Sequence, residues 1–146
     1  MSKRTIQNGV TYTTGKLARR AGVNLQTIRY YERSGLLPPP ERNESGYRQY
    51  TENALVRIRF IKKAQALGFS LKEIQELLRL RADKNRQCKE VRELVASKVE
   101  ELTEKIIELQ NAQETLQSLL ADADDSAPAP ECPFLVELEK QAAMAG

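Results

Sequence analysis

Short amphipathic segments separated by glycine make up the beginning of the chain. Small and apolar residues share one face of a helix expected over residues 13–21: Leu17, Ala18 and Ala21. Gly22 can adopt a positive φ and ends this helix, and Asn24 can cap a second helix over residues 25–33. Two short helices joined by a tight turn are typical of a helix-turn-helix. The small core between them is expected to contain three residues: Ala18, Val23 and Ile28.

A block of prolines and a β-prone segment follow these helices. The prolines at residues 38–40 stop a helix, because proline lacks a backbone N–H and clashes with the preceding turn. Ser45 and Gly46 form a turn dipeptide, and the alternation over residues 47–50 is typical of a strand. Residues 41–50 are therefore expected to form a small hairpin, the wing of a winged helix-turn-helix.

Two further amphipathic helices complete the first half of the chain. Thr51 is the expected cap of the third helix, and Gly68 is expected to end it. Ser70 and Glu73 have the spacing of a capping box at the start of a fourth helix. This half of the chain therefore predicts a winged helix-turn-helix domain over residues 12–81.

A much longer helix is predicted over residues 88–120. Apolar residues recur in it at heptad spacing in two offset rows, with one polar exception: Val95, Leu102, Leu109 and Leu116, then Val99, Ile106, Gln113 and Leu120. A helix with such a stripe needs a partner, because a chain this small cannot cover it. Self-association as a coiled coil is the simplest solution, and packing against the N-terminal domain is the alternative.

The last segment, residues 121–140, is predicted to be an acidic, proline-containing loop followed by a short helix. Residues 1–10 and 141–146 are expected to be weakly ordered. The predicted fold class is therefore mainly α. It comprises an N-terminal winged helix-turn-helix domain, a long dimerisation helix and a short C-terminal loop and helix.

Charge is divided unevenly between the two halves of the chain. The net charge is +3, but residues 1–81 contain 16 Lys and Arg against 6 Asp and Glu, whereas residues 82–146 contain 7 against 14. A basic domain of this kind has the electrostatic character of a nucleic-acid-binding protein. A solvated basic face is the simpler alternative.

Residue types exclude several functional classes. The chain has no His and two Cys, which excludes a disulfide scaffold and a four-cysteine metal site. No nucleophile–base pair or phosphate-binding loop is present in the sequence, so an enzyme is not expected. No apolar run is long enough for a membrane span, and residues 1–10 lack the apolar core of a secretory signal. A cytoplasmic protein without a membrane partner is therefore expected.

The second helix and the wing carry the candidate DNA-binding residues. In a helix-turn-helix, early residues of the second helix reach base edges in the major groove. Four side chains lie on or near that outer face: Gln26, Thr27, Arg29 and Tyr30. Arg42 and Arg48 of the wing are expected to approach backbone phosphates. Lys16 and Arg19 are further phosphate contacts by charge and position.

Three stretches of the chain resemble the MerR family of bacterial transcriptional regulators. They are Thr27–Leu37 (TIRYYERSGLL), Gly46–Tyr50 (GYRQY) and Leu67–Ile74 (LGFSLKEI). The resemblance implies a homodimer in which an antiparallel coiled coil joins two winged heads. It also implies a double-stranded promoter whose polymerase-recognition elements lie too far apart. The protein would bend and untwist this promoter for RNA polymerase, with backbone contacts offsetting the cost of deformation.

The same resemblance assigns DNA contacts to individual residues. Arg29 in the first stretch and three residues of the wing are expected to touch DNA: Arg42, Tyr47 and Arg48. Tyr31 either donates a hydrogen bond to a phosphate or is a core aromatic with a buried hydroxyl partner. Both interpretations of Tyr31 stay open from the sequence.

The resemblance also implies a metal site built from the two cysteines. Cys88 stands at the start of the dimerisation helix, where relatives that sense divalent ions have Cys, and Cys132 matches the last ligand beyond the coiled coil. Mercury- and lead-type relatives have a third Cys near residues 121–123, where this chain has Ala-Asp-Ala. Two thiolates from opposite subunits favour mercury(II), which accepts linear coordination. Lead, cadmium or zinc would need oxygen ligands from water or from carboxylates: Asp122, Asp124 and Glu131.

The function implied is a regulator that switches on metal-resistance genes at the nucleoid in the bacterial cytoplasm. Two alternatives share the same fold. One is a thiol-redox sensor in which Cys88 and Cys132 of different subunits form a disulfide. The other is a DNA-binding protein that responds to no effector, with both cysteines serving as small apolar side chains.

Overall fold

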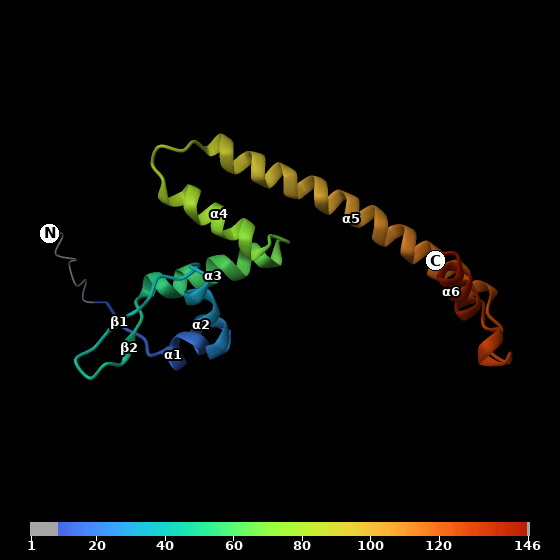
Figure 1. The fold of residues 1–146 in the computed structure, drawn as a ribbon, viewed down its shortest axis with the longest axis horizontal. Coiled ribbons are helices and arrows are strands. Elements are labelled where there is room, and N and C mark those ends of the chain that lie inside the picture. The colour runs from blue at the N-terminus through green and yellow to red at the C-terminus, as the bar shows by residue number, and fades with distance from the viewer. Residues whose placement is uncertain (1–8, 146) are drawn as a thin grey trace. The chain divides into compact units, whose positions relative to one another are not determined.

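The computed structural model describes residues 9–145, and most of them lie in helices (Figure 1). The elements are α1 (Thr14–Ala21), α2 (Leu25–Arg33), β1 (Glu41–Arg42), β2 (Arg48–Gln49), α3 (Glu52–Ala66), α4 (Leu71–Ala82), α5 (Cys88–Asp122), the 3-10 turn η1 (Ala129–Glu131) and α6 (Pro133–Met144). The prediction of a mainly α fold with a helix-turn-helix domain and a long helix is confirmed. The expectation of weak order at residues 1–8 lies outside the described residues.

The chain forms two compact units, and the division falls inside α5, between Val95 and Ala96. The first unit contains α1 to α4, the wing and the first two turns of α5. The second contains the rest of α5, η1 and α6. No helix in the described part of the chain is long and apolar enough to cross a membrane.

Local signals set the ends of α1 and α2. Thr13 Oγ1 accepts a hydrogen bond from the backbone N–H of Lys16 at 3.2 Å, and Asn24 Oδ1 accepts one from the N–H of Thr27 at 2.8 Å. Gly22 follows α1 with a φ of 69°, a left-handed conformation in which most other residues would be strained. The turn between the two helices is therefore fixed by residues within it.

One apolar core holds the first unit together. Ala18 and Ile28 are buried and Val23 packs against them half-buried, as predicted. Side chains from all four helices are almost completely buried there: Leu17, Ile28, Leu55, Ile58, Ile61 and Ile74. This packing holds one face of α2 inward and leaves its opposite face in solvent.

The predicted wing is an antiparallel hairpin in which Arg42 of β1 lies opposite Arg48 of β2. Asn43 closes its turn, because its Oδ1 accepts hydrogen bonds of 3.0 Å from two backbone N–H groups, those of Ser45 and Tyr47. The base of the wing is tied to the start of the described chain. Tyr12 and Tyr50 exchange backbone hydrogen bonds of 2.8 and 2.9 Å.

Capping differs between α3 and α4. Ser70 Oγ accepts from the N–H of Glu73 at 3.1 Å, and the Glu73 carboxylate accepts from the N–H of Ser70 at 2.8 Å. The predicted capping box is therefore complete. Thr51 occupies the cap position of α3, but its side chain makes no capping hydrogen bond, so its predicted capping role is wrong.

Ser70→Ala is expected to lower the free energy of unfolding by about 1 kcal/mol, because it removes the acceptor for an N-terminal N–H of α4. Thr51→Ala is the matched control and should change it by less than about 0.5 kcal/mol. Urea unfolding followed by circular dichroism measures both. Equal losses in the two variants would show that the capping box does not stabilise α4.

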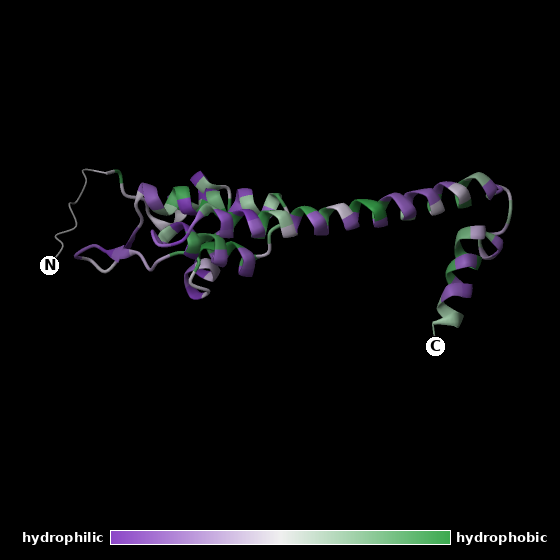
Figure 2. Cartoon of the chain, turned by 90° about the horizontal axis from the view of Figure 1, so that it is seen from above, coloured by the Kyte–Doolittle hydropathy of each residue, from purple (hydrophilic) through white to green (hydrophobic). Residues whose placement is uncertain are grey.

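The long helix presents its apolar stripe on an exposed surface. α5 is continuous and ends two residues beyond the predicted position 120. Hydrophobic residues recur along it in Figure 2, and members of both predicted rows are exposed: Val95, Val99, Leu102, Ile106, Leu109, Leu116 and Leu120. α6 extends to Met144, so the weak order predicted for residues 141–144 is wrong. Gln, Ala, Ala and Met at these positions are good helix formers and continue the helix.

Candidate nucleic-acid interface and metal centre

The outer face of α2 presents the side chains predicted to read DNA. Gln26, Arg29 and Tyr30 are exposed. Thr27 is half-buried, and its hydroxyl donates to Asn24 Oδ1 at 2.9 Å, so it also stabilises the start of the helix. An amide, a guanidinium and a phenol on one face provide the hydrogen-bonding groups that match base edges in a major groove.

Tyr31 belongs to the core of the first unit. It is 4% exposed, and its hydroxyl donates to Gln65 Oε1 of α3 at 3.2 Å. Burial raises the pKa of this phenol. Of the two interpretations that the sequence left open, this geometry favours the core aromatic over the phosphate contact.

The three predicted wing residues differ in how they are held. Tyr47 is 71% exposed near the tip. Arg42 is exposed, and its Nη1 donates to the carbonyl of Gly46 at 2.8 Å, so its stem lies along the hairpin turn. Arg48 is half-buried and donates from Nη1 to Glu32 Oε2 of α2 at 2.8 Å. The structure therefore brings the wing and α2 together through Arg48.

The basic residues considered on α1 and α3 are all exposed, but one of them also binds backbone carbonyls. Lys16 and Arg19 are exposed on α1, and their phosphate contacts stay a prediction. Lys62 of α3 instead donates from Nζ to the carbonyls of Ala21 and Gly22, at 3.2 and 3.1 Å. It thereby satisfies carbonyls at the end of α1, where a cation is favourable.

Glu32 is a polar centre that sequence reasoning missed. Its Oε2 accepts from Arg48 and its Oε1 accepts from the hydroxyl of Tyr50. Burial, with help from the bond to Glu32, raises the pKa of Tyr50. The pKa of Arg48 is also raised, first by its hydrogen bond with Tyr50 and then by the charge of Glu32. The sequence signal that could have found it is that Glu32 is the lone acidic residue of α2, whose other side chains are neutral or basic.

Arg57 is a second missed residue that positions α2. Its Nε donates to the carbonyl of Leu36 at 2.9 Å, so it holds the chain just after α2 against α3. Burial lowers the pKa of this guanidinium. The carbonyl that Arg57 binds lies 21 residues earlier in the chain, so only packing brings the two together.

Both cysteines lie at helix starts, one inside its helix and one at the cap position. Cys88 is the first residue of α5 and is exposed, and Cys132 is the N-cap residue of α6 and is half-buried. Both are free thiols. Cys88 belongs to the first unit and Cys132 to the second. Among residues 9–145, no group of three or more His, Cys, Asp or Glu is placed to hold an ion.

The carboxylates considered as additional ligands lie near Cys132 in sequence. Asp122 and Glu131 are exposed. Asp124 Oδ1 accepts from the hydroxyl and the N–H of Ser126 at 2.7 and 3.0 Å, and these bonds lower the pKa of Asp124. One oxygen of Asp124 is thus already used to shape the loop.

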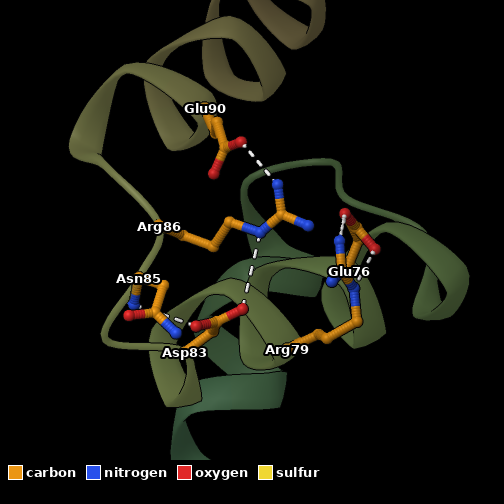
Figure 3. A network of polar contacts seen from close by, with 6 residues as sticks. All are labelled: Glu76, Arg79, Asp83, Asn85, Arg86 and Glu90. Atoms are coloured by element: carbon orange, nitrogen blue, oxygen red, sulfur yellow. Dashed lines mark hydrogen bonds and ion pairs between the residues drawn. The ribbon is translucent and has the colours of Figure 1, made fainter.

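Ion pairs connect α4 to the first turn of α5 (Figure 3). Arg86 lies between two carboxylates, with Nε 3.4 Å from Asp83 Oδ2 and Nη1 donating to Glu90 Oε1 at 3.0 Å. Glu90 is two residues after Cys88. Exposed pairs contribute at most about 1 kcal/mol each, so this network orients the linker more than it stabilises the fold.

Two family models match the chain. The first, the MerR HTH family regulatory protein, covers residues 12–81, and the second, MerR DNA binding, covers residues 55–119. Together they span the helix-turn-helix, the wing and most of α5.

Proteins of similar sequence and structure extend the match to nearly the whole chain. The mercuric resistance operon regulatory protein of Bacillus cereus is 38% identical over 89% of this chain and 98% of its own length. The lead(II) complex of the transcription regulator PbrR691 from Ralstonia metallidurans has 36% identity and a TM-score of 0.73, covering 86% of this chain and 97% of its own. The mercury(II) complex of MerR from Bacillus megaterium has 35% identity and a TM-score of 0.65, covering 88% of this chain and 99% of its own.

These matches agree with the basic, exposed face of α2, the wing and the long helix. They also agree with the expectation from the sequence that the chain is not an enzyme. The chain belongs to the MerR family of helix-turn-helix, DNA-binding transcriptional regulators.

Proposed function

We propose that this chain is a metal-responsive regulator that binds promoter DNA as a homodimer and switches on metal-resistance genes in the bacterial cytoplasm, together with RNA polymerase. One observation carries the proposal: a DNA-reading unit is joined through a short, ion-paired linker to a helix that begins with a thiol. Relatives whose names refer to mercury, and a similar structure that contains lead(II), support a metal ion as the signal.

The homodimer follows from the exposed stripe of α5. Leu102, Ile106 and Leu109 are between 36% and 70% exposed in a single chain. Leaving such a row in water is unfavourable, and heptad spacing matches a coiled coil. A second copy of the chain supplies a stripe of the same length.

Arg48→Ala is expected to weaken binding to all duplex DNA about equally, because a phosphate contact carries no sequence information. The slope of log K against log salt should fall by about one unit for each phosphate that the variant no longer neutralises. Fluorescence anisotropy with a labelled duplex over a salt series measures this slope. Arg29→Ala is the comparison, and it should alter the preference among duplexes. An unchanged slope for Arg48→Ala would remove the wing from the DNA contacts.

The donor set of the chain suits mercury(II) better than zinc. Two thiols and no imidazole are available, and a soft ion that accepts two thiolates fits this set. Tetrahedral zinc needs four donors, which two thiols do not provide. We infer that Cys88 of one subunit and Cys132 of the partner subunit hold the ion, with two such sites in the dimer. When bound, the ion supplies a strong link between the two thiolates.

The linker connects Cys88 to the end of α4 within the first unit. Arg86 contacts Asp83, just after α4, and Glu90, in the turn that begins with Cys88. A displacement of Cys88 is therefore passed to the end of α4 through short contacts. Repositioning of one packed element against another is a common form of switching.

Titration of the reduced dimer with mercury(II), lead(II), cadmium(II) and zinc(II), in competition with glutathione, tests the proposed effector. Tight binding of two mercury(II) ions per dimer, with a change in transcription from the bound promoter, is the expected result. A change driven by an intersubunit disulfide without metal would establish the redox sensor instead. Transcription that responds to neither treatment would indicate an effector-independent protein.

A further inference from the structure

Glu32 places a negative charge on the surface that carries the proposed DNA contacts. The surrounding segment, residues 1–81, is strongly basic. By electrostatics alone, a carboxylate here lowers the affinity for a polyanion. Its side chain is nevertheless only 11% exposed, held between α2 and the wing. The position of Glu32 between α2 and the wing indicates a structural role that offsets this loss of DNA affinity.

Both oxygens of Glu32 bind donors from one face of the wing. Arg48 and Tyr50 are two residues apart on extended backbone, so their side chains point to the same side. Tyr50 is held in place, because it is 2% exposed and its backbone pairs with Tyr12. Arg48 is accessible to solvent, with 32% of its side chain exposed.

We propose that Glu32 is a positioning residue that sets Arg48, and with it the wing, at a fixed distance from the recognition helix α2. A guanidinium has five N–H donors, and the Nη1 group of Arg48 is the one bound to Glu32. One further donor is shared with the Tyr50 hydroxyl, and the exposed part of the guanidinium is left for a DNA phosphate. Helix and wing then meet one duplex in a single register. This inference rests on the proposed DNA contact of Arg48.

Glu32→Gln tests the inference, because it keeps the shape of the side chain but removes its charge and one of the two oxygens that bind Arg48 and Tyr50. The probes are a duplex selected by the wild-type protein from a randomised pool and a scrambled duplex of equal length. We expect the ratio of affinities for selected and scrambled DNA to fall about tenfold. Affinity for the scrambled duplex should stay equal or rise, because a released Arg48 can still reach a phosphate there. Arg48→Ala differs, because it removes the phosphate contact from every duplex alike and so keeps the ratio.

Glu44→Gln is the matched control, because it removes the same charge from the exposed turn of the wing. The ratio of affinities for selected and scrambled DNA should stay within about twofold of the wild-type ratio. Tyr50→Phe removes the hydroxyl that binds Glu32 and Arg48 but leaves the Glu32 charge in place, so it should lower the ratio by a smaller factor. Thermal unfolding of each variant verifies the fold, and Tyr50→Phe keeps the inference testable if Glu32→Gln is unstable.

A double-mutant cycle separates positioning from general stabilisation. If Glu32 acts through Arg48, Glu32→Gln should lower the affinity ratio in the wild-type background and have little effect in Arg48→Ala. Equal effects in both backgrounds, or identical behaviour of Glu32→Gln and Glu44→Gln, would overturn the inference. A failure of the proposed function is distinct, because the wild-type protein itself would then select no duplex.

Discussion

The double variant Leu102→Glu, Leu109→Glu is expected to be monomeric at concentrations where the wild-type protein is a dimer. Both leucines lie in the same heptad row and are exposed in the single chain. In a coiled coil they would face the partner helix, and two unpaired carboxylates in the seam cost several kcal/mol. Sedimentation velocity measures the mass, and the protein should no longer bind a palindromic duplex once the dimer has dissociated.

Asn111→Glu, Ser118→Glu is the control for this variant. It adds the same charge to the same helix, but at positions opposite the apolar rows in the heptad. This control should remain dimeric and bind DNA. If Leu102→Glu, Leu109→Glu also stays dimeric, the stripe of α5 is not the dimer interface.

Heterodimers of Cys88→Ser and Cys132→Ser subunits are expected to bind one mercury(II) ion tightly, although neither variant does so as a homodimer. In such a heterodimer one site keeps both thiols and the other has neither. Each homodimer has only half-sites, and removal of one of two direct ligands should weaken binding by more than the roughly 10- to 100-fold that loss of an outer-shell partner costs. Purification through two affinity tags, followed by titration against glutathione, measures the stoichiometry.

A heterodimer of wild-type and doubly substituted Cys88→Ser, Cys132→Ser subunits is the matched control. It contains the same two thiols, but both belong to one chain. If each site is shared between subunits, this heterodimer should have no tight mercury(II) site. If each site lies within one chain, it should have one. Tight binding by this control, or by either single-variant homodimer, would refute the shared site.

Elements that depend on nearby residues could be predicted from the sequence. Thr13, Asn24 and Ser70 cap helices because each reaches a backbone N–H three residues away. The apolar stripe of α5 follows from heptad spacing alone. Thr51 shows the limit of such reasoning, because a residue suited to capping does not cap unless its side chain is oriented to do so.

The arrangement of the DNA-binding surface depends on tertiary packing. Tyr31 and Tyr30 are neighbours of the same type, yet Tyr31 is buried against Gln65, 34 residues away, and Tyr30 is 48% exposed. Helical periodicity allowed both interpretations of Tyr31, because a phenol can end either in a core or on a phosphate. Its burial and its hydrogen bond to Gln65 of α3 favour the core.

The sequence by itself determined the order of the helices, the wing, the exposed stripe and the positions of the two thiols. These follow from hydrophobic period, capping and turn residues, which act over a few positions. Only the tertiary structure decided that Glu32 binds Arg48 and that Lys62 binds the last carbonyl of α1, across 16 and 41 residues. Side chains so far apart in sequence meet only after the core has oriented their helices, and no local spacing encodes that contact.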